Sequence, residues 1–437
     1  MTKLFKIITL GCKVNQYESA FIEESLVNKG CQIAEQDKKA NLVIINGCIV
    51  TATASYQSRQ AIRRAIRENP QAIIAVVGCY GQVFPDELSK INGVDLIVGN
   101  KGKSSLPELL VNAIHHNPPL ILKEDFEASE PFEEIPVKSF SKRTRAFLKI
   151  QDGCQSFCTY CIVPMARGPL RSLEPDNVIK IVNNLEKNNY KEVVLTGIHL
   201  GKYGSDLSNG MNLTQLLIEI GENTPGIRIR LSSLKPTEIT TGLIELMAGN
   251  NWLCRHFHIS LQSGDDSVLQ RMNRHYTARM FAELVGEIDR LISKVSIGVD
   301  VLAGFPGEEE RSFNTTVKLL QKLPVSYLHV FPYSRREGTA AAQFSDHIDN
   351  KTIKERAFRL RSLDKEKRKI FRGSLVNQTF SVLAEGWAPR ERNLIWGLSD
   401  NYVRFYFPAK SLIKNRMVKV KAVSVTEKGI IAHQAGY

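Results

Sequence analysis

The amino-acid sequence predicts a multidomain α/β protein with three folded parts: a doubly wound parallel sheet, a full or partial βα barrel, and a small all-β barrel. Three observations support this prediction. The chain has 437 residues, which is more than one hydrophobic core usually spans. Short apolar runs alternate with amphipathic helical patterns over most of its length, as they do in parallel α/β sheets. The C-terminal segment instead alternates apolar and polar residues over short runs, which is typical of a small β barrel.

The first domain is expected at residues 1–118. Its apolar runs are rich in β-branched residues and end at Gly or Asn, which indicates fully buried parallel strands. Apolar residues at helical spacing separate these runs. The predicted strands are 4–11, 41–47, 72–78 and 94–100. This alternation predicts a doubly wound sheet, in which ligands bind beyond the carboxyl ends of the strands.

A linker rich in proline and acidic residues is expected at 119–142, and a second domain at 143–370. Six candidate strands, with helical patterns between them, predict a full or partial βα barrel whose chemistry lies at the carboxyl ends of the strands. The candidate strands are 146–153, 192–198, 227–233, 257–263, 295–305 and 327–333. The third domain, the small β barrel, is expected at 371–437.

Basic residues are concentrated toward the end of the sequence. The net charge is +13, and Lys351–Tyr437 contains 19 of the 58 basic residues but only 7 of the 45 acidic residues. A basic domain of this kind favours a polyanionic partner, either nucleic acid or acidic lipid. A solvated, charged helix face at 354–369 is the alternative interpretation.

The sequence gives no indication of a membrane segment. No apolar run approaches the roughly 18 residues that a membrane span requires. The first apolar run is short and gives way to polar residues, so it predicts a strand and not a secretory signal. We therefore expect a cytoplasmic protein.

Cysteine spacing gives the most specific prediction. Disulfides are not expected among the eight cysteines, because the cytosol keeps thiols reduced. Cys154, Cys158 and Cys161 form a Cys-x3-Cys-x2-Cys loop after the first strand of the second domain. Three thiolates suit a [4Fe–4S] cluster that keeps one iron open to another ligand. A structural zinc site is the alternative, but such sites usually have four ligands.

Three further cysteines follow equivalent strands of the first domain. Cys12, Cys48 and Cys79 each come just after a predicted strand and directly after a glycine. Because the carboxyl ends of parallel strands share one edge of the sheet, these thiols can converge as ligands. Each could instead be a small buried residue. Cys31 and Cys254 lie outside these patterns, and we interpret them as structural.

The cysteine loop resembles the signature of the radical S-adenosylmethionine (SAM) enzymes, including an aromatic residue, Tyr160, before the last cysteine. Essentially the full length resembles one branch of these enzymes, the methylthiotransferases. Besides the three N-terminal cysteines, the motifs that carry this resemblance are QDGCQSFCTYCIVPMARGPLRS at 151–172, HISLQSGDDSVLQRMNR at 258–274, GFPGE at 304–308 and FPYSRREGT at 331–339.

The resemblance implies an N-terminal cluster domain, a radical SAM barrel, and a C-terminal TRAM domain that binds nucleic acid. It implies SAM and two [4Fe–4S] clusters as cofactors. One cluster would cleave SAM to a 5′-deoxyadenosyl radical, and the auxiliary cluster would carry the sulfur that is inserted, with two SAM molecules used per product. The implied ligands of the first cluster are Cys154, Cys158 and Cys161, and those of the auxiliary cluster are Cys12, Cys48 and Cys79.

Other positions are expected near the cofactor. Thr196 and Gly197 end the second barrel strand, where these enzymes hold the SAM amino group; a plain strand-end turn is the alternative. Gln262 and Ser263 end a later strand and are candidates for contact with SAM or substrate, or for packing. Tyr160 is expected at the same site because it belongs to the cysteine loop.

Two arginines follow the cysteine loop. The guanidinium groups of Arg167 and Arg171 suit either the SAM carboxylate or a nucleic-acid phosphate, and a surface ion pair is the alternative. The segment 304–308 predicts a strand-to-helix turn and cap, not a phosphate loop. Gly47 departs from the family pattern, which usually has threonine before this cysteine, but ligation should not change because the thiol is kept.

Within the family, this chain is most similar to enzymes that act on N6-threonylcarbamoyladenosine, in the segments 11–19, 195–204, 232–238 and 329–339. The resemblance implies methylthiolation of carbon 2 of this nucleoside at tRNA position 37, beside the anticodon. One alternative is methylthiolation of N6-isopentenyladenosine at that position, although that group usually has a Gln-Asn-Val-Asn-type run at 197–200. Another alternative is an iron–sulfur RNA-binding regulatory protein without turnover.

The expected partners are tRNA, a flavodoxin- or ferredoxin-like electron donor and a sulfur source. The basic third domain agrees with tRNA, since Lys and Arg contacts to phosphate supply affinity without carrying sequence information. The sequence makes no prediction of oligomeric state. Candidates for the phosphate contacts are Arg404, Lys410, Lys414 and Arg416.

Overall fold

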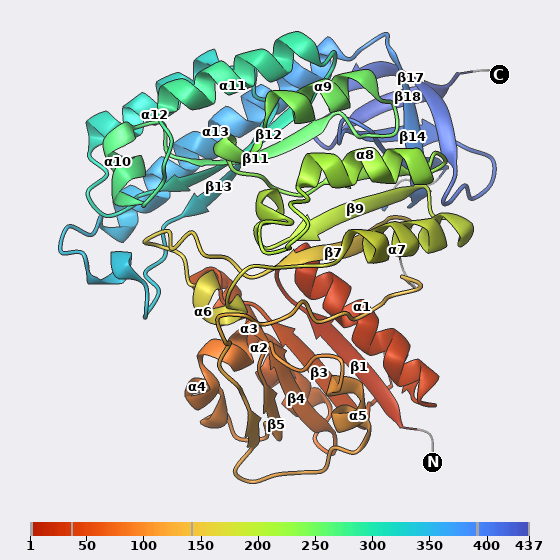
Figure 1. Cartoon of the computed structure of the whole chain (residues 1–437), viewed down its shortest axis with the longest axis vertical. Helices are drawn as coiled ribbons and strands as arrows, with labels where there is room; N and C mark the ends of the chain where they lie inside the picture. The colour runs from red at the N-terminus through yellow and green to blue at the C-terminus, as the bar shows by residue number, and fades with distance from the viewer. Residues whose placement is uncertain (1–2, 36–37, 141–142, 390–392, 436–437) are drawn as a thin grey trace.

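The computed structural model describes residues 3–35, 38–140, 143–389 and 393–435. Figure 1 shows three parts: an N-terminal sheet domain in red and orange, a central domain of strands and helices, and a small C-terminal barrel in dark blue. The fold class predicted from the sequence is confirmed. No helix in these residues is long and apolar enough to cross a membrane.

The N-terminal domain is a parallel sheet with the strand order β2–β1–β3–β4–β5–β6. Its strands are β1 (Leu4–Thr9), β2 (Gln32–Ile33), β3 (Leu42–Gly47), β4 (Ile73–Gly78), β5 (Leu96–Val98) and β6 (Leu120–Leu122). Its helices are α1 (Lys13–Asn28), α2 (Ala52–Glu68), α3 (Cys79–Val83), α4 (Pro85–Ser89) and α5 (Leu106–Val111). Every residue of β3 and β4 is buried, because separate apolar cores lie on the two faces of the sheet. β6 lies in the segment expected as a linker and extends the sheet by pairing with β5.

The central domain is a partial barrel of parallel strands. One sheet has the order β10–β9–β7–β8, with β8 antiparallel, and the other has the order β11–β12–β13. Isolated bridges at Ile229–Leu253 and Leu234–Ile259 connect β10 to the β11 side. Within the described ranges β13 pairs with β12 alone, so the barrel is partial and not full. The strands are β7 (Ala146–Asp152), β8 (Arg171–Ser172), β9 (Glu192–Gly197), β10 (Arg228–Leu231), β11 (His256–Gln262), β12 (Ser296–Ala303) and β13 (Tyr327–Pro332).

Helices cover the outer face of these strands, and their apolar stripes share one large core with the strands. These helices are α7 (Pro175–Lys187), α8 (Leu213–Asn223), α9 (Thr241–Gly249), α10 (Asp266–Arg271), α11 (Ala278–Leu291), α12 (Glu310–Lys322) and α13 (Asn350–Ser374). The short helix α6 (Val163–Arg167) instead packs against α3 of the N-terminal domain. Short 3-10 turns are η1 (Leu200–Lys202), η2 (Pro236–Glu238) and η3 (Ala340–Gln343).

Two local predictions can be checked in this domain. The 304–308 segment is a strand-to-helix turn, as predicted: Gly304 N donates to Glu308 Oε2 at 2.7 Å. The basic run at 354–369 lies within α13, whose apolar residues pack on the barrel while most of its charged residues face outward. The run therefore forms a largely solvated helix face, although Arg356 and Lys367 within it are buried.

The C-terminal domain is a closed barrel with the order β14–β15–β16–β18–β17. Phe380, Val382, Phe405 and Phe407 fill its centre. A closed barrel leaves no open sheet edge, which suits a small all-β domain. The strands are β14 (Thr379–Trp387), β15 (Leu394–Ser399), β16 (Arg404–Pro408), β17 (Met417–Val425) and β18 (Ile430–Gln434).

The turn between β15 and β16 docks at the amino-terminal ends of the central strands. The Glu192 carboxylate is fully buried and accepts hydrogen bonds from Arg228 Nε at 2.6 Å and Arg230 Nε at 2.8 Å. The remaining guanidinium nitrogens of Arg230 donate to the backbone oxygens of Ser399 and Asp400, at 2.9 and 2.8 Å. One buried carboxylate thus orients the arginine that ties the C-terminal barrel to the central domain.

Replacing Arg230 with Met should lower the free energy of unfolding by about 3–5 kcal/mol, because the buried negative charge of Glu192 would then be only partly neutralised. Chemical denaturation followed by circular dichroism would measure this loss. The matched control is Arg279→Met, which removes an exposed helical ion pair with Glu283 and should leave the unfolding midpoint unchanged. Equal losses in both variants would contradict the role of Arg230.

Candidate functional site

Three cysteines of the N-terminal domain lie at one edge of its sheet. Cys12 caps α1 after β1, Cys48 directly follows β3, and Cys79 opens α3 after β4. Because β1, β3 and β4 are neighbouring parallel strands, their carboxyl ends share that edge. Gly11 permits the close approach: its φ is +106°, and a Cβ there would lie 2.8 Å from the Cβ of Cys48. The structure therefore brings these three predicted residues together.

The environment of these thiols favours a bound cation. The pKa of Cys48 is raised to about 12, mainly by burial and in part by the neighbouring Cys79 and Cys12. Cys12 is exposed to solvent, whereas Cys48 and Cys79 are buried. Such thiols ionise when they coordinate a metal, because the metal charge offsets the desolvation. Three converging thiols fit the [4Fe–4S] cluster that the sequence implied.

Gly47, where this chain departs from the family pattern, has little room for a side chain. A Cβ at this position would lie 3.0 Å from the Cβ of Tyr80. Tyr80 is fully buried and its hydroxyl accepts a hydrogen bond from Arg59. The glycine therefore suits the packing of α3 against β3 and leaves the neighbouring Cys48 thiol in place.

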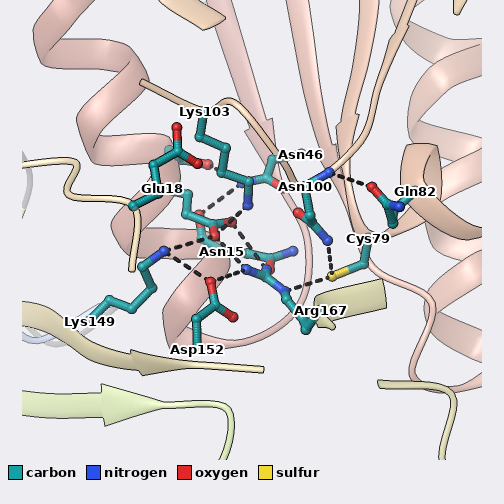
Figure 2. A network of polar contacts seen from close by, with 12 residues as sticks. Asn15, Glu18, Asn46, Cys79, Gln82, Asn100, Lys103, Lys149, Asp152 and Arg167 are labelled. Carbon is teal, nitrogen blue, oxygen red and sulfur yellow. Dashed lines mark hydrogen bonds and ion pairs between the residues drawn. The ribbon is translucent and has the colours of Figure 1, made fainter. Parts of the chain in front are cut away.

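Arg167 joins this edge to the central domain, as Figure 2 shows. Its side chain is 1% exposed, and its Nε donates to Cys79 Sγ at 3.3 Å. The other nitrogens donate to Asn15 Oδ1 at 2.7 Å and to Glu18 Oε1 at 2.5 Å. Asn15 Oδ1 also lies 3.6 Å from Cys12 Sγ. The guanidinium of Arg167 thus contacts Cys79 directly and Cys12 through Asn15.

Further buried charges surround Glu18 and Arg167. Lys103 pairs with Glu18, and Lys149 Nζ lies 3.0 Å from Asp152 Oδ2. Arg167 Nη1 is 3.4 Å from the same Asp152 oxygen. Burial raises the pKa of Glu18, but Arg167, Lys103 and Lys149 outweigh it, so the pKa lies below its usual range. Both carboxylates therefore stay ionised, and α1 is held against β7 by charge pairing.

The two arginines after the cysteine loop are not at the surface. The nitrogens of Arg167 are directed at protein atoms, which favours a role beside Cys79 over the predicted contact with SAM or phosphate. Arg171 is also buried, stacks on Phe126 and donates to the backbone oxygen of Arg167 at 2.8 Å. The alternative of a surface ion pair is wrong for both, because their ion pairs are buried.

The second set of cysteines lies in the loop between β7 and α6, at the carboxyl end of the first barrel strand. The loop is tied down at both ends: Cys154 N donates to Gly168 O at 3.0 Å, and Cys161 N donates to Cys158 O at 2.9 Å. Asn273 donates to the backbone oxygen of Phe157, the exposed tip of the loop, at 3.1 Å. The loop is therefore preorganised with its three thiols close together.

A chain of polar contacts runs from Cys154 through a histidine to a carboxylate. Its Sγ lies 3.6 Å from His199 Nδ1, and His199 Nε2 pairs with Glu238. Burial raises the pKa of Cys154, but His199 outweighs that effect and lowers the pKa to about 7. This thiol therefore ionises readily, as a metal ligand must. The sequence assigned no role to His199 or Glu238, although both lie in segments, 195–204 and 232–238, that carry the resemblance.

Cys158 contacts an arginine that the sequence also left unassigned. Arg274 Nη1 donates to Cys158 Sγ at 3.5 Å, and its Nη2 donates to Ser260 Oγ at 2.9 Å. Tyr276 accepts from Arg274 Nε at 2.9 Å and fixes the guanidinium. Arg274 belongs to the 258–274 motif, so its place in that motif was the available signal.

The residues predicted near SAM lie at strand ends, as expected. Their neighbours differ from one residue to the next. Thr196 is buried, and Gly197 packs so closely on Gln151 that a Cβ would lie 2.9 Å from Gln151 Cβ. Gln262 has a φ of +72°, a left-handed conformation that is rare for a side chain of this size. The Ser263 hydroxyl lies 3.2 Å from that of Thr316 and accepts from Asp265 N, so it serves packing and capping.

Tyr160 is the remaining residue predicted beside the cofactor. Its ring packs edge-on against Phe305, and burial raises its pKa well above the usual range. Two cavities flank the loop that carries it. One, of about 380 Å³, is lined by His199, Lys235, Glu238 and Arg274. The other, of about 370 Å³, is lined by Cys158, Cys161, Met165, Gly338 and Thr339.

The four cations predicted to contact phosphate are all exposed on the C-terminal barrel: Arg404, Lys410, Lys414 and Arg416. Arg404 also lines a cavity of about 310 Å³ at the junction with the central domain, where it stacks on Trp396. The residues lining this cavity include no Asp or Glu but five cations, Arg145, Arg368, Arg372, Arg404 and Lys428. The sequence missed this set because its members come from three distant segments.

Comparison with known proteins gives consistent matches over the chain. Residues 4–99 match the family described as Uncharacterized protein family UPF0004, and residues 148–320 match the Radical SAM superfamily. The chain is 39% identical over 416 residues to Threonylcarbamoyladenosine tRNA methylthiotransferase MtaB of Bacillus subtilis (strain 168), covering 94% of this chain and 92% of the relative. The chain belongs to the radical SAM methylthiotransferase family. Members of this family use SAM and [4Fe–4S] clusters.

Other relatives of this methylthiotransferase differ in the substrate that they are named for. The tRNA-2-methylthio-N(6)-dimethylallyladenosine synthase of Moorella thermoacetica (strain ATCC 39073 / JCM 9320) is 32% identical over 428 residues, covering 96% of this chain and 95% of the relative. The solved structure of the radical SAM methyltransferase TsrM from Kitasatospora setae has 16% identity and a TM-score of 0.54, and covers 76% of this chain and 77% of that one. That structure shares the fold of the methylthiotransferase.

Replacing Asn100 with Leu should lower the reduction potential of a cluster held by Cys79. Asn100 Nδ2 donates to Cys79 Sγ at 3.4 Å, and hydrogen bonds to cluster sulfurs tune the potential. A redox titration followed by electron paramagnetic resonance would measure the change. Asn112→Leu, at the exposed C-cap of α5, is the matched control. An unchanged potential in the Asn100 variant would show that Cys79 is not a cluster ligand.

Proposed function

We propose that this enzyme methylthiolates carbon 2 of N6-threonylcarbamoyladenosine at tRNA position 37. The observation that carries the proposal is the junction at Arg167. This residue lies only six positions after Cys161 in the sequence, yet its side chain contacts Cys79 of the other cysteine set. A radical site and a sulfur-donating site must act on one carbon atom, so the two sets have to lie in the same region.

In this proposal Cys154, Cys158 and Cys161 hold the radical-generating cluster, and Cys12, Cys48 and Cys79 hold the auxiliary one. When bound, the clusters supply an electron for SAM cleavage and a place for the inserted sulfur. His199 and Arg274 orient two ligands of the first set, while Arg167 and Asn100 orient a ligand of the second. Such outer contacts fix the positions of the ligands.

The relatives support the choice of substrate. Those named for threonylcarbamoyladenosine reach 39% identity, whereas those named for dimethylallyladenosine reach 32%. The local segments already pointed the same way, so the isopentenyl-type substrate is the second candidate. A binding protein without turnover has no need of a three-thiol site that leaves one iron open, and the Cys154 loop argues against it.

The proposal also covers the molecules with which the enzyme interacts and the cellular compartment in which it acts. Exposed cations of the C-terminal barrel, together with the cationic cavity that contains Arg404, would bind tRNA phosphates. Radical chemistry requires an electron donor, for which a flavodoxin- or ferredoxin-like protein is suited. Repeated turnover also requires a sulfur source. A tRNA substrate fits a cytoplasmic enzyme.

Anaerobically reconstituted enzyme should contain about eight irons per chain if both sets hold a [4Fe–4S] cluster. With SAM, reductant and tRNA carrying threonylcarbamoyladenosine, it should form 5′-deoxyadenosine and the 2-methylthio nucleoside, detected by mass spectrometry. A parallel reaction with isopentenyladenosine tRNA tests the second candidate. Product from that tRNA alone would refute the proposed substrate.

A triple Ala variant of Cys12, Cys48 and Cys79 should retain about four irons and cleave SAM without forming product. The matched triple variant of Cys154, Cys158 and Cys161 should lose SAM cleavage itself. Iron analysis and quantification of 5′-deoxyadenosine distinguish the two variants. Methylthiolated tRNA from the first variant would show that the N-terminal cysteines are structural.

A further inference from the structure

A polar triad lies on three adjacent strands of the central domain and has no part in either cysteine site. We call His258 of β11, Asp300 of β12 and His329 of β13 the inner-face triad. Asp300 is directly opposite His329 in the parallel register, and His258 is opposite Gly298, two residues before Asp300. Their ligand-type atoms all lie within 4.8 Å of one another.

The triad faces away from the helices that cover the sheet. Side chains alternate along a strand, and the neighbours of the triad belong to the apolar core shared with the helices. The triad must therefore point to the concave inner face of the partial barrel. The neighbours that fix this orientation are Phe257, Ile259, Val299, Val301, Leu328 and Val330.

Hydrogen bonds hold two members of the triad and leave the third open. His258 Nε2 lies 2.6 Å from Asp300 Oδ1, and His258 Nδ1 lies 3.2 Å from the Tyr327 hydroxyl. His329 Nδ1 is 3.6 Å from Asp300 Oδ1, and its side chain is 45% exposed, against 13% for His258 and 16% for Asp300. His329 is thus the member that a ligand on the inner face would meet.

The same arrangement argues against a metal ion at the triad. Two ligands at usual zinc bond lengths of about 2.0–2.1 Å stand farther apart in tetrahedral geometry than the hydrogen-bonded atoms of His258 and Asp300. Both ring nitrogens of His258 are also engaged within the protein. The triad is better suited to serve as a hydrogen-bonding surface for an organic group.

This surface extends toward both cysteine sites. Ser260, two residues after His258 on the same face of β11, accepts from Arg274, which also donates to Cys158. Burial lowers the pKa of His256, and the charges of Arg230, His258 and Lys13 lower it further, so Lys13 lies near this face as well. Lys13 directly follows Cys12. A base placed between the two sites can therefore extend a substituent onto the triad.

We propose that His329, which lies beside Asp300 and packs against the ring of His258, is the specificity-determining contact for the carboxylate and hydroxyl of the threonylcarbamoyl substituent. This inference rests on the proposed function and names the group that recognises its substrate. A charged or hydroxylated substituent can pair with the open imidazole of His329, whereas an isopentenyl substituent would leave that imidazole desolvated and unpaired. Sites built on buried hydrogen bonds reject analogues that lack the matching group.

The first test compares variants on a synthetic anticodon stem-loop RNA that carries threonylcarbamoyladenosine. His329→Phe should lower kcat/KM about 10- to 100-fold, the usual effect of losing a hydrogen bond to a charged group. SAM cleavage without RNA should not change, because His329 contacts neither cysteine set. His329→Gln keeps a donor and should restore much of the activity. His115→Phe, another exposed histidine beside a carboxylate (Asp95), is the matched control.

The second test uses the same RNA with the substituent carboxylate converted to its methyl ester. The wild-type enzyme should lose activity on the ester to about the extent that His329→Phe loses it on the acid, and the variant should not discriminate between them. Independent, multiplying losses would overturn the inference, because the two groups would then not interact. If the wild type makes no product from the acid, the proposed function fails, and the inference fails with it.

Discussion

The buried ion pairing around Arg167 is the interaction on which the arrangement of the first two domains depends. Glu18 comes from the N-terminal domain and Asp152 from the central domain, and the guanidinium between them is withdrawn from water. A buried charge is very costly without its partner, so removing one member of this network would leave the others buried and uncompensated. The same guanidinium donates to Cys79. Charge pairing therefore sets the spacing between the two groups of cysteines as well as the contact between the domains.

Much of the fold could be predicted because it depends on local patterns. The runs that became β3 and β4 are apolar apart from Asn46 and a terminal glycine in each, which requires cover on both faces of the sheet. Whether the barrel is full or partial could not be predicted, since the strands and helices repeat identically in either case. A full barrel requires β13 to pair with β7, and no local sequence pattern predicts that pairing. The short strand β6 was missed because its residues follow two prolines, a typical linker signal.

In the candidate site, too, features that depend on local sequence could be predicted, whereas contacts between distant residues could not. The spacing of Cys154, Cys158 and Cys161 predicts its own chemistry, because packing alone rarely places three thiols on one short loop. The contact of Arg167 with Glu18 could not be predicted, since Glu18 lies 149 positions away in the sequence. His199 and Arg274 were missed for a related reason: each acquires its role only from a thiol that the fold brings beside it. Sequence patterns show ligands better than they show what orients them.

The docked turn between β15 and β16 has a consequence for how an RNA can be handled. Because Arg230 anchors that turn at the amino-terminal ends of the barrel strands, the basic barrel and the Cys154 loop lie at opposite ends of the central domain. The distance between the basic barrel, which would bind RNA, and the Cys154 loop is therefore set by this docking contact. An RNA bound to the basic barrel therefore has to reach the Cys154 loop across the central domain. The target base must leave its stack and cross the span while the remaining nucleotides stay bound.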